Sequence, residues 1–109
     1  MEGKKTYPKP KNYIFNTVYD IIELQNGELI LSDTKLGRIY YKVSMYGYVW
    51  EFLYVITELR TGKCEVSIRV IGERKDKARE IRREFSLLDA MLDGGSNVEL
   101  VDTDKVMPT

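Results

Sequence analysis

The chain has 109 residues, which is the length of one domain, and its 17 Lys and Arg are balanced by 17 Asp and Glu. A net charge of zero gives no bulk electrostatic reason to bind nucleic acid or a membrane. With no His and a single Cys, the chain lacks the residues for a Ser–His or Cys–His dyad, an intrachain disulfide or a thiolate zinc site, so we expect no cofactor and no metal.

The first segment, residues 1–11, is basic and contains Pro8 and Pro10, which predicts an extended N-terminal arm. It lacks the continuous apolar run of a signal peptide, and no stretch of the chain reaches the ~20 apolar residues of a membrane span. The lone Cys64 lies in an alternating strand pattern, which is typical of a packed thiol in a reducing compartment. We therefore expect a cytoplasmic protein.

Residues 12–24 carry apolar side chains at helical spacing: Ile14, Val18, Ile21 and Ile22. The pair Asn26-Gly27 follows and is typical of a helix end. β-Branched residues are frequent in this segment, so a strand is the alternative, but the spacing favours a helix.

Between Glu28 and Ile71 the apolar period is two, which predicts four strands: residues 28–33, 37–45, 48–59 and 64–71. A two-residue turn at positions 46–47 pairs Val43 with Trp50 on one face of the sheet. On the other face, the same turn sets Lys42 opposite Glu51, which is a favourable ion pair.

The next turn, at residues 60–62, fits a three-residue loop with Gly62 in the left-handed conformation. That loop sets Tyr54 beside Ile68, so both turns predict one common core face. Its members are Ile39, Tyr41, Val43, Trp50, Phe52, Tyr54, Val66, Ile68 and Val70.

Residues 74–92 predict a second helix, whose apolar stripe is Ala78, Ile81, Phe85, Leu88 and Leu92. Gly94-Gly95 ends it, and residues 94–109 form an acidic tail. The order of elements predicts an α+β fold, an α-β-β-β-β-α antiparallel meander with both helices packed on one face. We expect a single domain over residues 12–93, between the arm and the tail.

The run NGELILSDTKLGRIYYKV, preceded by a short helix, resembles small helix–sheet–helix domains, the BamC-like and TATA-binding-protein-like halves. The resemblance covers residues 12–92 and consists of turn and strand punctuation. It implies a fold and carries over no functional residue, because a shared fold does not supply a function.

The connections between the predicted strands are only a few residues long, and they leave no large loop from which to build a catalytic cleft. Cys64 has no His to activate it as a nucleophile. We therefore expect no enzyme, and predict a non-enzymatic binding or assembly module.

One candidate interface is the outer face of the sheet, where Tyr40, Leu53 and Val55 lie beyond the reach of the helices. A strand that is apolar on both faces is typical of burial on both sides, so we expect a protein partner or a homodimer there. The alternative is a single-stranded nucleic-acid binder that uses Tyr40 and neighbouring basic residues. Glu51 and Glu65 disfavour it, because base stacking on aromatic residues is favoured by basic neighbours.

The other candidate interface is the second helix, which carries a basic row on one side: Lys75, Arg79 and Arg82. An acidic row lies on the other side: Asp76, Glu80 and Glu84. Such rows form either an ordinary solvated face or a docking surface for a partner with complementary charges.

Overall fold

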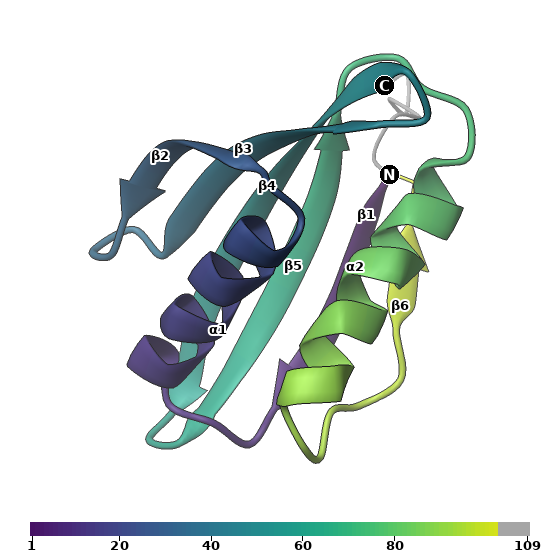
Figure 1. The fold of residues 1–109 in the computed structure, drawn as a ribbon. Coiled ribbons are helices and arrows are strands. Elements are labelled where there is room, and N and C mark those ends of the chain that lie inside the picture. The colour runs from purple at the N-terminus through teal and green to yellow at the C-terminus, as the bar shows by residue number, and fades with distance from the viewer. Residues whose placement is uncertain (103–109) are drawn as a thin grey trace, which may run out of the picture.

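The computed structural model describes residues 1–102 and shows a six-stranded antiparallel sheet with two helices on one face (Figure 1). In chain order the elements are β1 (Glu2–Tyr7), α1 (Lys11–Leu24), β2 (Glu28–Asp33), β3 (Arg38–Met45), β4 (Tyr48–Arg60), β5 (Lys63–Ile71), α2 (Lys77–Met91) and β6 (Glu99–Val101). The strands lie in the order β2-β3-β4-β5-β1-β6. The predicted α+β class is confirmed, including the meander of β2 to β5 and the placement of both helices.

The N-terminal segment differs from the predicted extended arm, because β1 lies inside the sheet between β5 and β6. Its inward positions are Gly3, Lys5 and Tyr7, and only the last is a large apolar residue. A Cβ on Gly3 would lie 2.5 Å from the side chain of Ile81, so glycine permits α2 to approach the strand. Because two of the three inward positions are a glycine and a lysine, the segment lacks the alternation of apolar residues that predicts a strand.

The predicted acidic tail also differs, since Glu99–Val101 forms β6 and pairs with β1. Leu100 packs against the core from this strand. The part of the predicted tail at residues 103–109 lies outside the described residues.

The turns gave the register correctly. Tyr46 and Gly47 both have positive φ, 56° and 77°, as a two-residue hairpin turn requires, and Val43 pairs with Trp50. Tyr54 pairs with Ile68 as predicted. The loop itself is shorter than expected, because Arg60 pairs with Lys63 and a register irregularity lies between Glu58 and Arg60.

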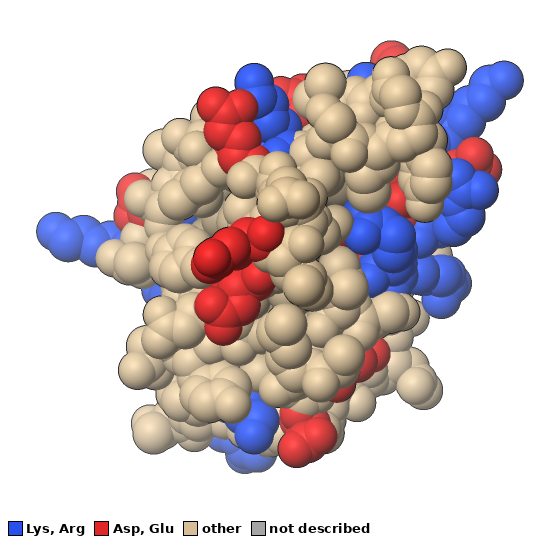
Figure 2. Space-filling model, viewed as in Figure 1, with Lys and Arg blue, Asp and Glu red and all other residues tan. Residues whose placement is uncertain are grey.

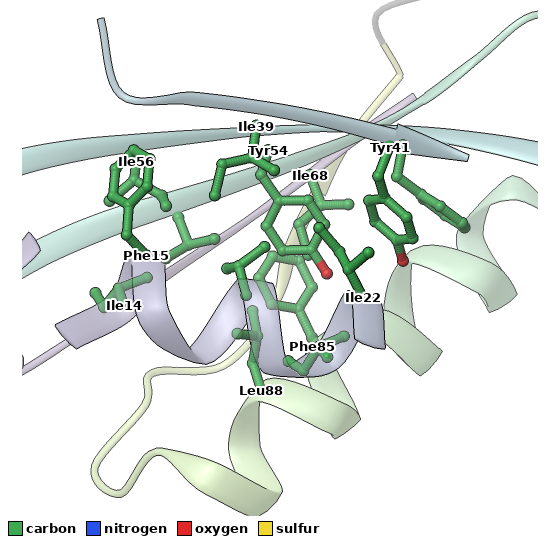
Figure 3. Close-up of a cluster of buried hydrophobic side chains, with 14 of the residues drawn as sticks. Ile14, Phe15, Ile22, Ile39, Tyr41, Tyr54, Ile56, Ile68, Phe85 and Leu88 are labelled. Carbon is green, nitrogen blue, oxygen red and sulfur yellow. The ribbon is translucent and has the colours of Figure 1, made fainter. Parts of the chain in front are cut away.

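All nine residues of the predicted core face are buried, and they are Ile39, Tyr41, Val43, Trp50, Phe52, Tyr54, Val66, Ile68 and Val70. Figure 3 shows Phe85 and Leu88 of α2 and Ile22 of α1 together with the sheet residues Tyr54 and Ile68 in one cluster. The segment at 12–24 is helical, as its apolar spacing predicted.

The single thiol of the chain, on Cys64, lies in the interior. Cys64 is fully buried, and burial raises the pKa of its thiol, which removes nucleophilic thiolate. Neither helix within residues 1–102 has the length and apolar character needed to cross a bilayer.

We predict that Phe85→Ala lowers the free energy of unfolding by about 3–5 kcal/mol, because it empties a site that is 1% exposed. Ser86→Ala is the matched control, since Ser86 is exposed and donates only to the carbonyl of Arg82. Its cost should stay within about 0.5 kcal/mol. Urea unfolding of the two variants measures both, and equal losses would contradict this placement of Phe85.

Candidate functional site

A hollow of about 410 Å³ lies between the turn that joins β3 to β4 and the start of α2. We call it the α2 hollow, and its lining residues are Tyr46, Tyr48, Trp50, Glu73, Arg74, Lys75, Asp76 and Arg79. These residues come from two segments that are far apart in the sequence. Figure 1 shows α2 starting at the end of the sheet where β5 ends, which brings the second segment to the hollow.

One side of the α2 hollow is aromatic. Tyr48 and Trp50 are two positions apart on β4, so both point to the helix-bearing face of the sheet. The guanidinium carbon of Arg74 lies 5.6 Å from the centre of the Tyr48 ring and 5.7 Å from that of Trp50. Arg74 also donates from Nη2 to the carbonyl of Val49 at 2.7 Å, so this cation–π arrangement is anchored to the backbone.

The charged side of the α2 hollow carries an excess of cations. Arg79 is shared between Asp76 at 3.5 Å and Glu80 at 3.2 Å. Lys75 makes no ion pair or hydrogen bond to any residue of the described chain. Figure 2 shows Lys and Arg side chains gathered over the first half of α2.

The Trp50 indole is the buried polar group of this site. The side chain is 5% exposed, and its Nε1 has no hydrogen-bond partner within residues 1–102. A buried donor without an acceptor costs about 1–3 kcal/mol.

A buried polar cluster lies behind the α2 hollow, between the helices and the sheet. We call it the Glu84 cluster: Gln25, Tyr41, Tyr54, Arg83 and Glu84. The hydroxyls of Tyr41 and Tyr54 both donate to Oε1 of Glu84, the latter at 2.7 Å. Arg83 donates from Nη2 to Oε2 of Glu84 at 2.7 Å and from Nη1 to Oε1 of Gln25 at 2.8 Å. Gln25 in turn donates to the Tyr41 hydroxyl at 3.0 Å, which closes the network.

Burial is the largest influence on the pKa of Glu84, Tyr41 and Tyr54. It raises the pKa of the Glu84 carboxyl, although hydrogen bonds from Tyr41 and Tyr54 and the charge of Arg83 act to lower it. Burial also raises the pKa of Tyr41 and of Tyr54, and the nearby Glu84 charge adds to both shifts. For Arg83, burial acts to lower the pKa, but the charges of Glu84 and Glu80 raise it overall.

Glu80 connects the Glu84 cluster to the α2 hollow. Its side chain is 1% exposed and accepts from Arg79 at 3.2 Å and from Arg83 at 2.8 Å. The position of Arg79 in the hollow therefore depends on a chain of contacts that ends at Glu84, inside the core.

Sequence reasoning placed Glu80 and Glu84 in an acidic row at the edge of the helix and missed their burial. The signal that could have found them is the pair of tyrosines, Tyr41 and Tyr54, on the predicted core face. A buried tyrosine hydroxyl needs a partner, and a helix carboxylate facing the sheet supplies one.

Of the predicted basic row, Lys75 and Arg79 line the α2 hollow, whereas Arg82 is exposed outside it. The helix begins at Lys77 rather than at residue 74, so Lys75 lies in the connection that precedes it. The residue at the N-cap, Asp76, has a left-handed φ of 61° and makes no side-chain cap hydrogen bond.

The outer-face residues Tyr40, Leu53 and Val55 lie on the opposite side of the sheet from the α2 hollow. They are only half-buried, and the Tyr40 hydroxyl donates to Glu51 at 2.5 Å. Leu53 and Val55 line a hollow of about 310 Å³ on that face. An interface with a partner or a second copy there stays a prediction.

We predict that the stability difference between the wild type and Glu84→Gln shrinks as the pH rises from about 4 to about 8. The pKa of Glu84 is raised by folding, so the folded state binds its proton more tightly than the unfolded state does. The contribution of Glu84 to the free energy of unfolding is therefore largest below the ordinary value of 4.5 and falls as the pH rises through the raised pKa.

Urea unfolding at several pH values measures this difference. Ser86→Ala, which changes no titratable group, should differ from the wild type by the same amount at every pH. A difference for Glu84→Gln that grows with pH would contradict the raised pKa.

No family model and no curated protein matches this chain. Among solved structures, it is similar to the di-domain ARO/CYC protein StfQ from the steffimycin biosynthetic pathway, with a TM-score of 0.50 and 14% identity. The similarity covers 85% of this chain and 44% of that one, so the chain spans less than half of the StfQ chain. At this identity the likeness concerns the fold. It supports an α+β fold and does not support the BamC-like or TATA-binding-protein-like resemblance.

This neighbour overturns the expectation that the protein is not an enzyme. A fold of the same kind occurs in an aromatase/cyclase, so short connections between strands do not exclude catalysis. The reason is visible in this structure, where a hollow forms between a strand turn and a helix start without any long loop.

Proposed function

We propose that the protein binds a small molecule in the α2 hollow. The observation that carries this is the hollow itself, whose 410 Å³ lies within the roughly 300–1,000 Å³ of small-molecule sites. Its lining combines three aromatic residues with five charged residues. Aromatic side chains beside polar groups that orient a ligand are features of small-molecule sites.

The fold supports the same proposal. StfQ, which has a similar fold, is a di-domain ARO/CYC protein from the steffimycin biosynthetic pathway. The proposed function is therefore small-molecule binding, and the groups that line the α2 hollow are the ones that would act on a bound molecule.

A second hollow of about 320 Å³ lies over α1 and provides a comparison within the same molecule. Its lining residues are Lys11, Asn12, Phe15, Asn16, Tyr19 and Thr34. Lys11 is the one charged residue among them, and no cation–π contact joins these residues. The α2 hollow is therefore the more highly charged of the two sites, and the hollow over α1 is the more apolar.

The test uses Trp50, the single tryptophan of the chain, whose indole N–H gives one signal in a ¹⁵N–¹H correlation spectrum. We expect indole, 2-naphthol and 2-naphthoate, titrated in turn, to shift this signal together with amides of residues 73–79. Tyr48→Ala should weaken binding about tenfold, because it removes an exposed stacking surface at no cost to the core.

Tyr13→Ala is the matched control, since Tyr13 is a half-exposed tyrosine on α1 that lines neither hollow. It should leave the affinities unchanged. Shifts confined to Phe15, Tyr19 and their neighbours would assign binding to the α1 side and overturn the proposal, as would probes that shift no signal.

A further inference from the structure

The aromatic side of the α2 hollow is suited to a flat ring. Tyr46 and Tyr48 are 69% and 61% exposed, so their faces are open to a ligand, whereas Trp50 is covered. Arg74 is exposed as well and is held against Tyr48 by its hydrogen bond to the Val49 carbonyl. Both a tyrosine ring and a guanidinium plane stack well on an aromatic ring.

The balance of charges in the lining defines the charge of the ligand. Among the cations, Arg79 is paired with Asp76, whereas Arg74 and Lys75 have no carboxylate partner in the described chain. Among the acids, Glu73 alone is without a partner there. Two unpaired cations against one unpaired carboxylate leave an excess of one positive charge.

The start of α2 adds to this excess. A helix of 15 residues begins at the hollow, and the side chain of Asp76 does not cap its first N–H groups. The positive end of the helix dipole therefore faces the same space as Arg74 and Lys75. A ligand with one negative charge balances the site, whereas a ligand with two or more brings its extra charge close to Glu73 and Asp76.

From these observations we infer that the α2 hollow takes a small planar aromatic monoanion, in chemistry an aromatic carboxylate. The inference rests on the proposed function and narrows its ligand class. Tyr48 and Arg74 stack on the ring, and Lys75 binds the carboxylate.

The experiment compares four probes by calorimetry and by the Trp50 indole signal. 2-Naphthoate is the planar monoanion, 2-naphthamide is its neutral analogue, decalin-2-carboxylate is a non-planar monoanion, and 2-naphthyl phosphate at about pH 8 is a planar dianion. We expect 2-naphthoate to bind at least about tenfold more tightly than each of the other three.

Two variants test whether the charge of Lys75 binds the carboxylate. Lys75→Gln should weaken 2-naphthoate about fivefold to tenfold and leave 2-naphthamide unchanged. Arg82→Gln, an exposed arginine of the same helix outside the hollow, should change neither affinity.

The outcomes distinguish failure of the proposed ligand class from failure of small-molecule binding itself. Equal affinities of 2-naphthoate and 2-naphthamide at the α2 hollow would overturn the monoanion and leave small-molecule binding intact. Tighter binding of the phosphate, or equal binding of the non-planar acid, would overturn the aromatic carboxylate in the same way. If none of the four probes bound in the hollow, both proposals would be overturned.

Discussion

The hydrogen bonds that Tyr41 and Tyr54 donate to the buried carboxylate of Glu84 hold the molecule together at its centre. They join two strands of the sheet to α2, and Arg83 extends the network to Gln25 at the end of α1. Burial of a carboxyl group is costly unless hydrogen bonds compensate for the lost water, and here two hydroxyls and a guanidinium donate to Glu84. The network therefore links both helices to the sheet through directional contacts that add to the apolar packing.

A second anchor acts at the other end of α2 and holds β1 in the sheet between β5 and β6. Asp89 accepts from the Lys5 ammonium at 2.6 Å and from the Tyr7 hydroxyl at 2.7 Å. Both donors come from β1, and Gly3 of the same strand lets α2 approach closely. The helix is thus fixed to the sheet at two points, and its first turn is held in a defined place beside the β3–β4 turn.

The α2 hollow is a consequence of this anchoring. Arg79 is oriented through Glu80 and Arg83, which reach back to Glu84, so its position in the hollow is set from inside the core. Arg74 is oriented from the other side by the Val49 carbonyl and two aromatic rings. Groups held by packed neighbours lose less conformational entropy on binding a ligand than free surface side chains do. A hollow of this kind needs no long loop, so short strand connections do not exclude one.

The amino-acid sequence by itself determined the meander and its register, because alternation and turn chemistry are local properties. Gly47 and Gly62 stand where hairpin turns need positive φ, and the turn type fixes how the flanking strands align. Tertiary structure decided what depends on distant partners. The burial of Lys5 in β1 depends on its ion pair with Asp89, which is distant in the sequence. A lysine at an inward position has no local signature of burial, so the sequence does not predict this strand. Glu84 becomes a core residue only when Tyr41 and Tyr54 lie opposite it, and the α2 hollow exists only because residues 46–50 and 73–79, separate in the chain, meet at one end of the sheet.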